Sequence, residues 1–102
     1  MALIRVNKTA SGAIYNENAS ANSLTLTNAC VEGYVTVGSR TSAAGTAPTV
    51  SASDGTLTQI ENVGFGDQAG GMRVYKLENA AAGTTLTASG VYSNPIISIT
   101  YK

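Results

Sequence analysis

The chain contains few of the side chains that enzymes use to move protons or to attack bonds. It has 102 residues and no histidine, which is the commonest general base and the usual partner of a nucleophilic Ser or Cys. A carboxylate pair is the remaining route to hydrolysis. The downstream candidates are Asp54, Glu61, Asp67 and Glu78. Asp54 stands before a glycine, as turn residues do, and Glu78 follows a predicted strand. We therefore expect no catalytic residue and no enzymatic activity.

Metal and cofactor sites are not predicted either. Cys30 is the only cysteine, which excludes an intramolecular disulfide and a cysteine-based metal site, so we expect it to be a buried apolar side chain. Glu61-Asn62 and Asp67-Gln68 border a Gly-rich loop, but their spacing fits no calcium-loop pattern. Gly64-Phe65-Gly66 lacks the Lys-Ser/Thr ending of a phosphate-binding loop. The expected metal ligands and cofactors are none.

Charge in this sequence is low and balanced. Six Lys and Arg residues balance six Asp and Glu residues, so the formal net charge at pH 7 is zero. Because non-specific nucleic-acid binding needs clustered positive charge, and the basic residues are scattered, we predict no nucleic-acid partner. Charged residues make up 12% of the chain, against about 25% in typical soluble domains. A near-neutral surface favours association, which is a first indication of a protein that works in an assembly.

The first residues, MALIRVNKTASGAIY, contain neither the apolar stretch of a signal peptide nor a transmembrane span. We therefore predict synthesis in the cytoplasm without a signal peptide, and no membrane partner.

Short runs of alternating apolar and polar residues indicate β-strands throughout, and no window has helical periodicity. The predicted strands are residues 2–6, 23–27, 31–37, 48–52, 56–60, 72–77, 84–88 and 96–101. About eight strands in a chain of this length are typical of a β-sandwich. Alternation places one set of side chains inside: Leu24, Leu26, Gly33, Val35, Val37, Ile97, Ile99 and Tyr101.

Turn residues separate the predicted strands and divide the chain. Asp54-Gly55 permits the positive φ angles of a tight turn, so we expect residues 48–52 and 56–60 to pair as an antiparallel hairpin. Residues 7–22 are polar and weakly patterned, which indicates a long loop or an arm. The expected organisation is an N-terminal strand with an arm or loop over residues 1–22, and a β-sandwich domain over residues 23–102.

Several segments carry a resemblance to a known family. They are residues 23–27, 33–37, 47–55, 73–77 and 80–87. In this order they resemble the opening strand pair, the Pro-Thr-Val-Ser hairpin, the Val-Tyr strand and the Ala-Gly-Thr-Thr segment of an Ig-like β-sandwich found in small bacteriophage virion proteins. The resemblance covers residues 23–102. It implies an all-β fold, a single Ig-like antiparallel β-sandwich of about eight strands with an N-terminal arm or long loop.

The resemblance also implies a function. Members of this family occur as capsid decoration proteins, tail-associated domains and adhesive modules. We expect a non-enzymatic structural protein of a phage particle, a capsid decoration (cement) protein that binds the outer shell as an oligomer. The expected partners are the major capsid protein or another virion protein and further copies of the chain, with a trimer as one option, and the expected location is the virion. The alternative is a tail or fibre module that recognises a host glycan or surface protein through loops 38–47 and 62–71.

Candidate interface residues are apolar or aromatic side chains near the N-terminus and in predicted loops. They are Leu3, Ile4, Val6, Ile14, Tyr15, Phe65 and Tyr92. Amphipathic rings often anchor contacts between proteins. We interpret residues 2–14 as an arm that adds a strand to the sheet edge of a neighbour.

Overall fold

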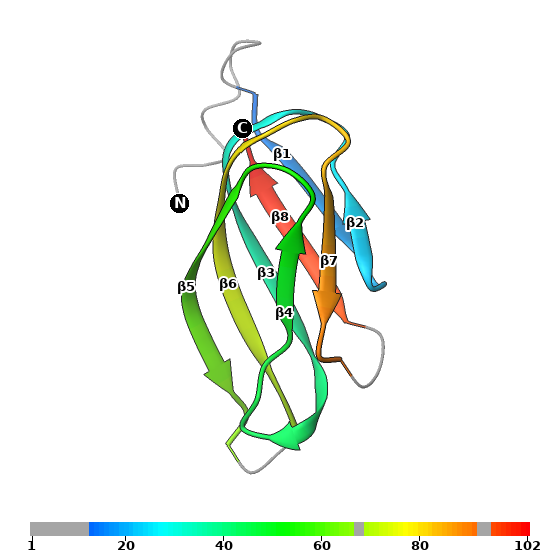
Figure 1. The fold of residues 1–102 in the computed structure, drawn as a ribbon, viewed down its shortest axis with the longest axis vertical. Helices are drawn as coiled ribbons and strands as arrows, with labels where there is room; N and C mark the ends of the chain where they lie inside the picture. The colour runs from blue at the N-terminus through cyan, green and yellow to red at the C-terminus, as the bar shows by residue number, and fades with distance from the viewer. Residues whose placement is uncertain (1–12, 67–68, 92–94) are drawn as a thin grey trace.

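The computed structural model of the chain describes residues 13–66, 69–91 and 95–102 (Figure 1). Their regular structure is entirely β. The strands are β1 (Tyr15–Ala19), β2 (Ser23–Thr25), β3 (Cys30–Ala44), β4 (Thr49–Ala52), β5 (Thr56–Gly64), β6 (Ala69–Ala80), β7 (Thr85–Ser89) and β8 (Ile96–Tyr101). The all-β fold that the alternating pattern predicts is therefore confirmed.

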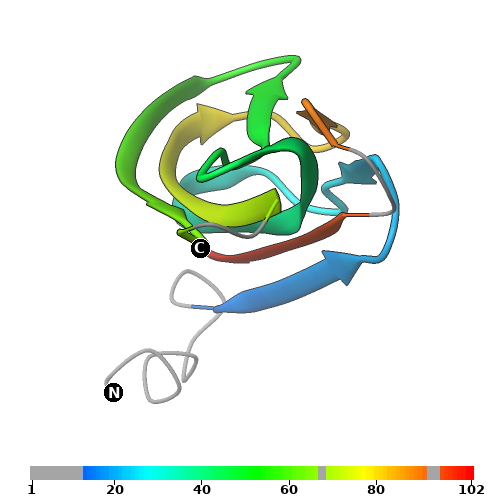
Figure 2. The same ribbon diagram turned by 90° about the horizontal axis from the view of Figure 1, so that it is seen from below.

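The strands form two antiparallel sheets that pack face to face. The large sheet has the order β1-β8-β3-β6-β5 and the small sheet the order β2-β7-β4. Viewed end-on, the large sheet curves around the small one, with β1 at one extreme and β5 at the other (Figure 2). This is the β-sandwich expected from the sequence. Ig-like sandwiches share this architecture but not always one strand order.

The order of the strands follows a nested pattern. β1 pairs with β8, β2 with β7, and β3 with β6, so the first half of the chain runs alongside the second half in reverse. The nesting stops at these three pairs, because β4 lies in the small sheet and β5 pairs with β6 in the large one. Because consecutive strands mostly alternate between the sheets, most connections cross from one sheet to the other.

Seven of the eight predicted strands correspond to strands of the structure. The remaining one, residues 2–6, lies outside the described residues. β1 falls within residues 7–22, which the sequence predicted as a loop or arm, so that part of the prediction is wrong for residues 15–19. The predicted inward faces are confirmed, with Val35, Ile97 and Tyr101 almost fully buried.

The predicted hairpin between residues 48–52 and 56–60 is wrong. β4 pairs with β7 in the small sheet and β5 pairs with β6 in the large one, so the two strands lie in different sheets. Asp54-Gly55 does form a turn, and Gly55 has a φ of 81°. The turn instead carries the chain between the sheets.

Hydrogen bonds to the β6–β7 connection hold this turn. The Asp54 carboxylate accepts the backbone N–H of Ala81 at 2.8 Å. Ser53 donates its N–H to the Thr85 carbonyl at 3.0 Å, and its hydroxyl accepts the Thr85 N–H at 2.9 Å. These partners lie far along the chain, which is why the local Asp-Gly signal could not reveal the sheet change.

The core lies between the sheets and is built from the inward positions of both. Its buried members are Leu26, Cys30, Val35, Val37, Val50, Tyr75, Leu77, Ala80, Leu86, Ala88, Ile97, Ile99 and Tyr101. The hydroxyl of Tyr75 accepts the N–H of Val50 at 3.0 Å. This buried polar group is therefore hydrogen-bonded, and the bond links the two sheets.

Gly33 lets β3 and β8 approach closely in the core. A Cβ on Gly33 would overlap the Cβ of Tyr101 and lie 2.9 Å from the Thr100 carbonyl oxygen. On the outer face of the same strand, a Cβ on Gly38 would only touch the Met72 side chain at 3.4 Å. The two glycines therefore differ in the room that is left for a side chain.

We expect Gly33→Ala to lower the free energy of unfolding by at least about 2 kcal/mol, because the added methyl group overpacks the core. Gly38→Ala is the matched control on the same strand, and it should change stability by less than about 1 kcal/mol. Urea unfolding measures both variants. Equal losses of stability would contradict the close approach of β3 and β8.

Candidate functional site

The predicted interface residues do not form one site. Leu3, Ile4, Val6 and Tyr92 lie outside the described residues. Ile14 and Tyr15 lie at the start of β1, whereas Phe65 follows β5 at the opposite end of the molecule (Figure 1). Tyr15 is partly buried, with its ring centroid 5.3 Å from that of Tyr101, so it packs against the core.

A row of apolar residues crosses the outer face of the large sheet. Gly38 on β3 is in register with Met72 on β6 and with Ile96 on β8, and Met72 is in turn in register with Val63 on β5. Residues in register point to the same face. Val63, Met72 and Ile96 are 49%, 41% and 57% exposed. We call Val63, Met72, Gly38 and Ile96 the apolar row.

A groove with a volume of about 560 Å³ lies over three members of this row, Gly38, Met72 and Ile96. Its lining residues are Thr36, Gly38, Ser39, Arg40, Phe65, Met72, Ile96 and Ser98. The absence of a side chain at Gly38 leaves a hollow between Met72 and Ile96. The volume falls in the range of sites that bind a ligand or a segment of a partner.

Phe65 forms one wall of the groove, and backbone contacts fix its position. Its N–H donates to the Gly70 carbonyl at 3.0 Å, which closes the turn between β5 and β6. A Cβ on Gly70 would lie 3.0 Å from the Phe65 ring, so a larger residue at position 70 would crowd the ring. Phe65 is 46% exposed and, of the predicted interface residues, it is the one that the structure places at the apolar row.

The outer face becomes polar and charged away from the row. The next register row contains Glu61, Val74, Thr36 and Ser98. Beyond it, Lys76 pairs with Glu78, and Lys102 with Glu32, each at 3.6 Å. Such exposed pairs contribute little to stability. An apolar partner that covered this end of the face would have to remove these charged groups from water, which costs free energy.

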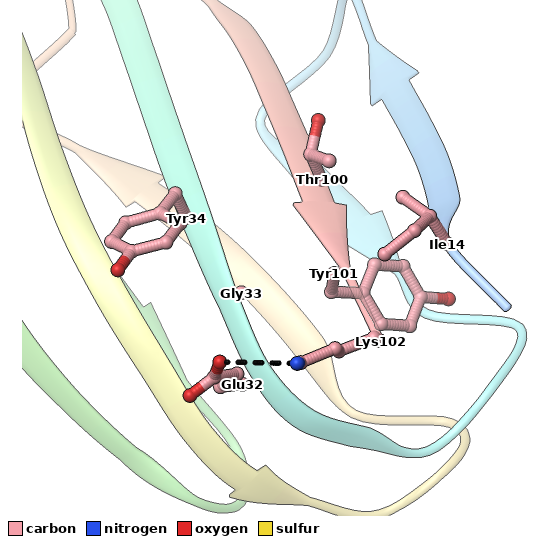
Figure 3. A pocket seen from close by; sticks show the side chains of 7 residues that line it. All are labelled: Ile14, Glu32, Gly33, Tyr34, Thr100, Tyr101 and Lys102. Carbon is pink, nitrogen blue, oxygen red and sulfur yellow. Dashed lines mark ion pairs between the residues drawn. The ribbon is translucent and has the colours of Figure 1, made fainter. Parts of the chain in front are cut away.

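A second, smaller hollow lies at that charged end (Figure 3). Its volume is about 70 Å³, far below that of a typical ligand site. Ile14, Tyr34 and Thr100 line it together with the Glu32–Lys102 pair. Tyr34 and Thr100 are in register on the outer face, whereas Gly33 and Tyr101, which also line the hollow, are in register on the inner face. The hollow therefore lies at the end of the β3–β8 pair.

A hydrogen-bonded cluster fixes β1 to the body of the sandwich. The Tyr101 hydroxyl donates to the Glu17 carboxylate and accepts the Asn28 N–H at 3.2 Å. Glu17 also accepts the Thr27 N–H at 3.3 Å. Burial, and then the hydrogen bond to Glu17, raise the pKa of the Tyr101 hydroxyl, so it stays neutral as a donor. The cluster joins β1, β8 and the β2–β3 loop, a structural role.

The segments 38–47 and 62–71, which the sequence predicted as loops, meet at the end of the molecule that carries the groove. That prediction is wrong for residues 38–44, 62–64 and 69–71, which belong to β3, β5 and β6. A Cβ on Gly64 would overlap the Gly45 carbonyl, so the backbones are in contact. Arg73 holds the adjoining segment by donating to the Pro48 carbonyl at 2.9 Å and to the Ala47 carbonyl at 3.1 Å. The structure thus brings together the two segments that the sequence proposed for glycan recognition, but mainly as the ends of β3, β5 and β6 and not as loops. Residues 67–68 are not described.

The described part of the chain carries neither a metal-binding cluster nor a membrane-spanning helix. Over residues 13–66, 69–91 and 95–102, no group of three or more His, Cys, Asp or Glu side chains could hold a metal ion. The same residues contain no helix of the length and apolarity needed to cross a membrane.

Sequence reasoning did not identify Val63, Met72 and Ile96 as interface residues. Strand alternation could have placed Ile96 outward, since Ser98 and Thr100 share its face. A single exposed apolar residue is ordinary, however, and the register that aligns the three was needed to recognise a row.

Comparison of the chain with protein-family models, with curated proteins and with solved structures gives no match. The family resemblance described from the sequence therefore stays a hypothesis.

Cys30 is a buried thiol on β3, as the sequence predicted. Its Sγ donates to the Leu77 carbonyl at 3.7 Å. Burial, and then the charge of Glu32, raise its pKa from 9.0 to about 11. Because the thiolate is the reactive form, the native protein should not react with thiol reagents at neutral pH.

The raised pKa of Cys30 also predicts how stability depends on pH. Folding favours the neutral thiol, so its contribution is fully present below pH 9 and is lost as the pH rises toward about 11. Urea unfolding across this range should show a steeper fall in the free energy of unfolding for the wild type than for Cys30→Ala. Parallel profiles, or rapid thiol labelling of the native protein at pH 8, would contradict this assignment.

Proposed function

We propose that this chain is a non-enzymatic structural protein of a phage particle, a capsid decoration protein that binds its partner through the apolar row and the groove above it. The observation that carries the proposal is the alignment of Val63, Met72 and Ile96 across four adjacent strands, with Phe65 beside them. Contiguous exposed apolar side chains are uncommon on a monomer and mark interaction surfaces.

The physical character of the face supports binding by burial of apolar surface. Val63, Phe65, Met72 and Ile96 remain between 41% and 57% exposed in the isolated chain. Each Å² of apolar surface that a partner covers contributes roughly 25 cal/mol before the cost of association. The charged pairs Lys76–Glu78 and Lys102–Glu32 lie toward the other end of the face, where they can form a polar rim.

The partners proposed for this face are the major capsid protein or another virion protein. Further copies of the chain are also proposed as partners, with a trimer as one arrangement. The proposed location is the virion. The zero net charge supports close packing with other subunits, since little repulsion opposes it. The family resemblance of residues 23–102 supplies the phage context.

A tail or fibre module that recognises a host glycan or protein is the second candidate. The specific observation in its favour is the contact between the segments 38–47 and 62–71 at Gly45 and Gly64. The turns that follow β3 and β5 thus lie together at one end of a rigid sandwich, where binding residues are common. Binding of the isolated chain to a glycan array would favour this candidate.

Quantitative mass spectrometry of purified particles of the phage that encodes the chain tests the first candidate. We expect a copy number commensurate with that of the major shell protein. A handful of copies per particle would support the tail or fibre module, and absence from the particles would overturn both.

A further inference from the structure

We propose that the free edge of β5 is a second binding surface, and that it pairs antiparallel with the β5 edge of another copy of the chain. This edge is separate from the groove on the outer face. The inference deepens the proposed function by naming where copies of the chain meet, and it rests on that function for the expectation of an assembly.

β5 is the longest edge strand of the described fold. β1 and β5 are the edges of the large sheet, and β2 and β4 are those of the small one. β1, β2 and β4 have five, three and four residues, whereas β5 has nine. Proteins protect an edge by keeping it short, by a bulge, or by Lys and Pro. Residues 56–64 contain neither Lys nor Pro, and Glu61 is their only charged residue. The bulge between Gln59 and Glu61 leaves residues 61–64 in regular register.

The backbone of Asn62 points away from β6. The Phe65 N–H donates to the Gly70 carbonyl at 3.0 Å, across the turn that joins the two strands. Backbone bonds alternate along an antiparallel pair, so Val63 also bonds toward β6, whereas Asn62 directs its N–H to the free edge. In the isolated chain this N–H donates to the carboxylate of Glu61 at 3.3 Å. The carboxylate stands where the carbonyl of a further strand would accept the same N–H.

A further strand has room beside β5. The side chains of residues 58–63 are all exposed, on the inner face of the sheet as well as on the outer one. In the end-on view, β5 lies at the extreme of the large sheet (Figure 2). The turn after β3 contacts β5 at its last residue, where Gly45 meets Gly64. The described part of the chain therefore leaves most of this edge accessible.

A second copy of the chain supplies the matching edge. In an antiparallel pair around a two-fold axis, the same strand lies on both sides, so each copy provides the hydrogen-bond partners that the other needs. The formal net charge of zero opposes such an approach little. Ile60, which is 52% exposed at the bulge, would gain apolar contacts across the pair.

Pairing at β5 would also bring two apolar rows together. A two-fold axis perpendicular to the sheet maps the outer face of one copy onto the outer face of the other, so both rows point to the same side. Val63 belongs to the row and lies on the paired strand, which places the two rows next to each other. A dimer therefore presents two rows to one particle surface, and attachment at two points strengthens binding.

Sedimentation velocity of the purified chain measures the self-association. A contact confined to one strand is small, so we expect a weak dimer with a dissociation constant of about 0.1 mM. Asn62→Pro removes the N–H at the free edge without removing a bond to β6, and it should weaken dimerisation at least about tenfold. Asn62→Ala keeps this N–H and is the matched control, which should dimerise as the wild type does. Equal dimerisation of the two variants, or a wild type that stays monomeric at about 1 mM, would overturn the proposal.

Amide hydrogen exchange of the wild type tests the same contact without a substitution. With the expected dissociation constant, about a fifth of the chain is monomeric at about 1 mM, so the Asn62 amide should exchange about fivefold more slowly there than at high dilution. The amides of β2 and β4, the edges of the other sheet, should exchange at the same rate in both solutions. An Asn62 rate that does not depend on concentration would exclude the β5 contact.

Ile96→Asn separates this surface from the apolar row. Ile96 lies on β8, at the other end of the row from β5, so the variant should dimerise as the wild type does. Dimerisation that is lost in Ile96→Asn but kept in Asn62→Pro would place the contact at the row and overturn the inference. All three experiments use the isolated chain, so their outcome is distinguishable from success or failure of the proposed binding to particles.

Discussion

The pairing of β3 with β8 on one side and β6 on the other is the constraint on which the structure depends. Both registers pass through the same strand, so they fix the inner and outer faces of the large sheet together. On the inner face, the close approach at Gly33 seats Tyr101 in the core. On the outer face, Gly38 stands between Met72 and Ile96 and leaves the hollow of the groove. A one-residue slip of either register would exchange these faces.

The sequence predicts the strands well because their local pattern is strong. Ile97, Ile99 and Tyr101 alternate with polar residues, and the strand they form has the predicted bounds. β1 was missed because its inward position 17 is a glutamate. That carboxylate is satisfied by the Tyr101 hydroxyl, a residue at the other end of the chain, and no local pattern can reveal such a partner.

Pairing and the candidate site were harder to predict than the strands. Asp54-Gly55 has the chemistry of a hairpin turn, yet hydrogen bonds to Ala81 and to the segment beside it direct the chain to the other sheet. The apolar row likewise contains residues from four strands. They are far apart in the sequence, and only the strand register shows that they are neighbours. Phe65 could be predicted as an exposed aromatic residue, but its neighbours Met72 and Ile96 could not.

The central claim is that the apolar row is the surface through which the chain binds. Co-sedimentation with purified phage particles that lack the chain would test it directly, with Ile96→Asn compared to Val31→Asn. Val31 is 65% exposed and lies outside the row, so it is a matched control for loss of an exposed aliphatic side chain. We predict that Ile96→Asn weakens binding at least tenfold, or about 1.4 kcal/mol, while Val31→Asn binds as the wild type does. Equal binding by both folded variants would contradict the claim.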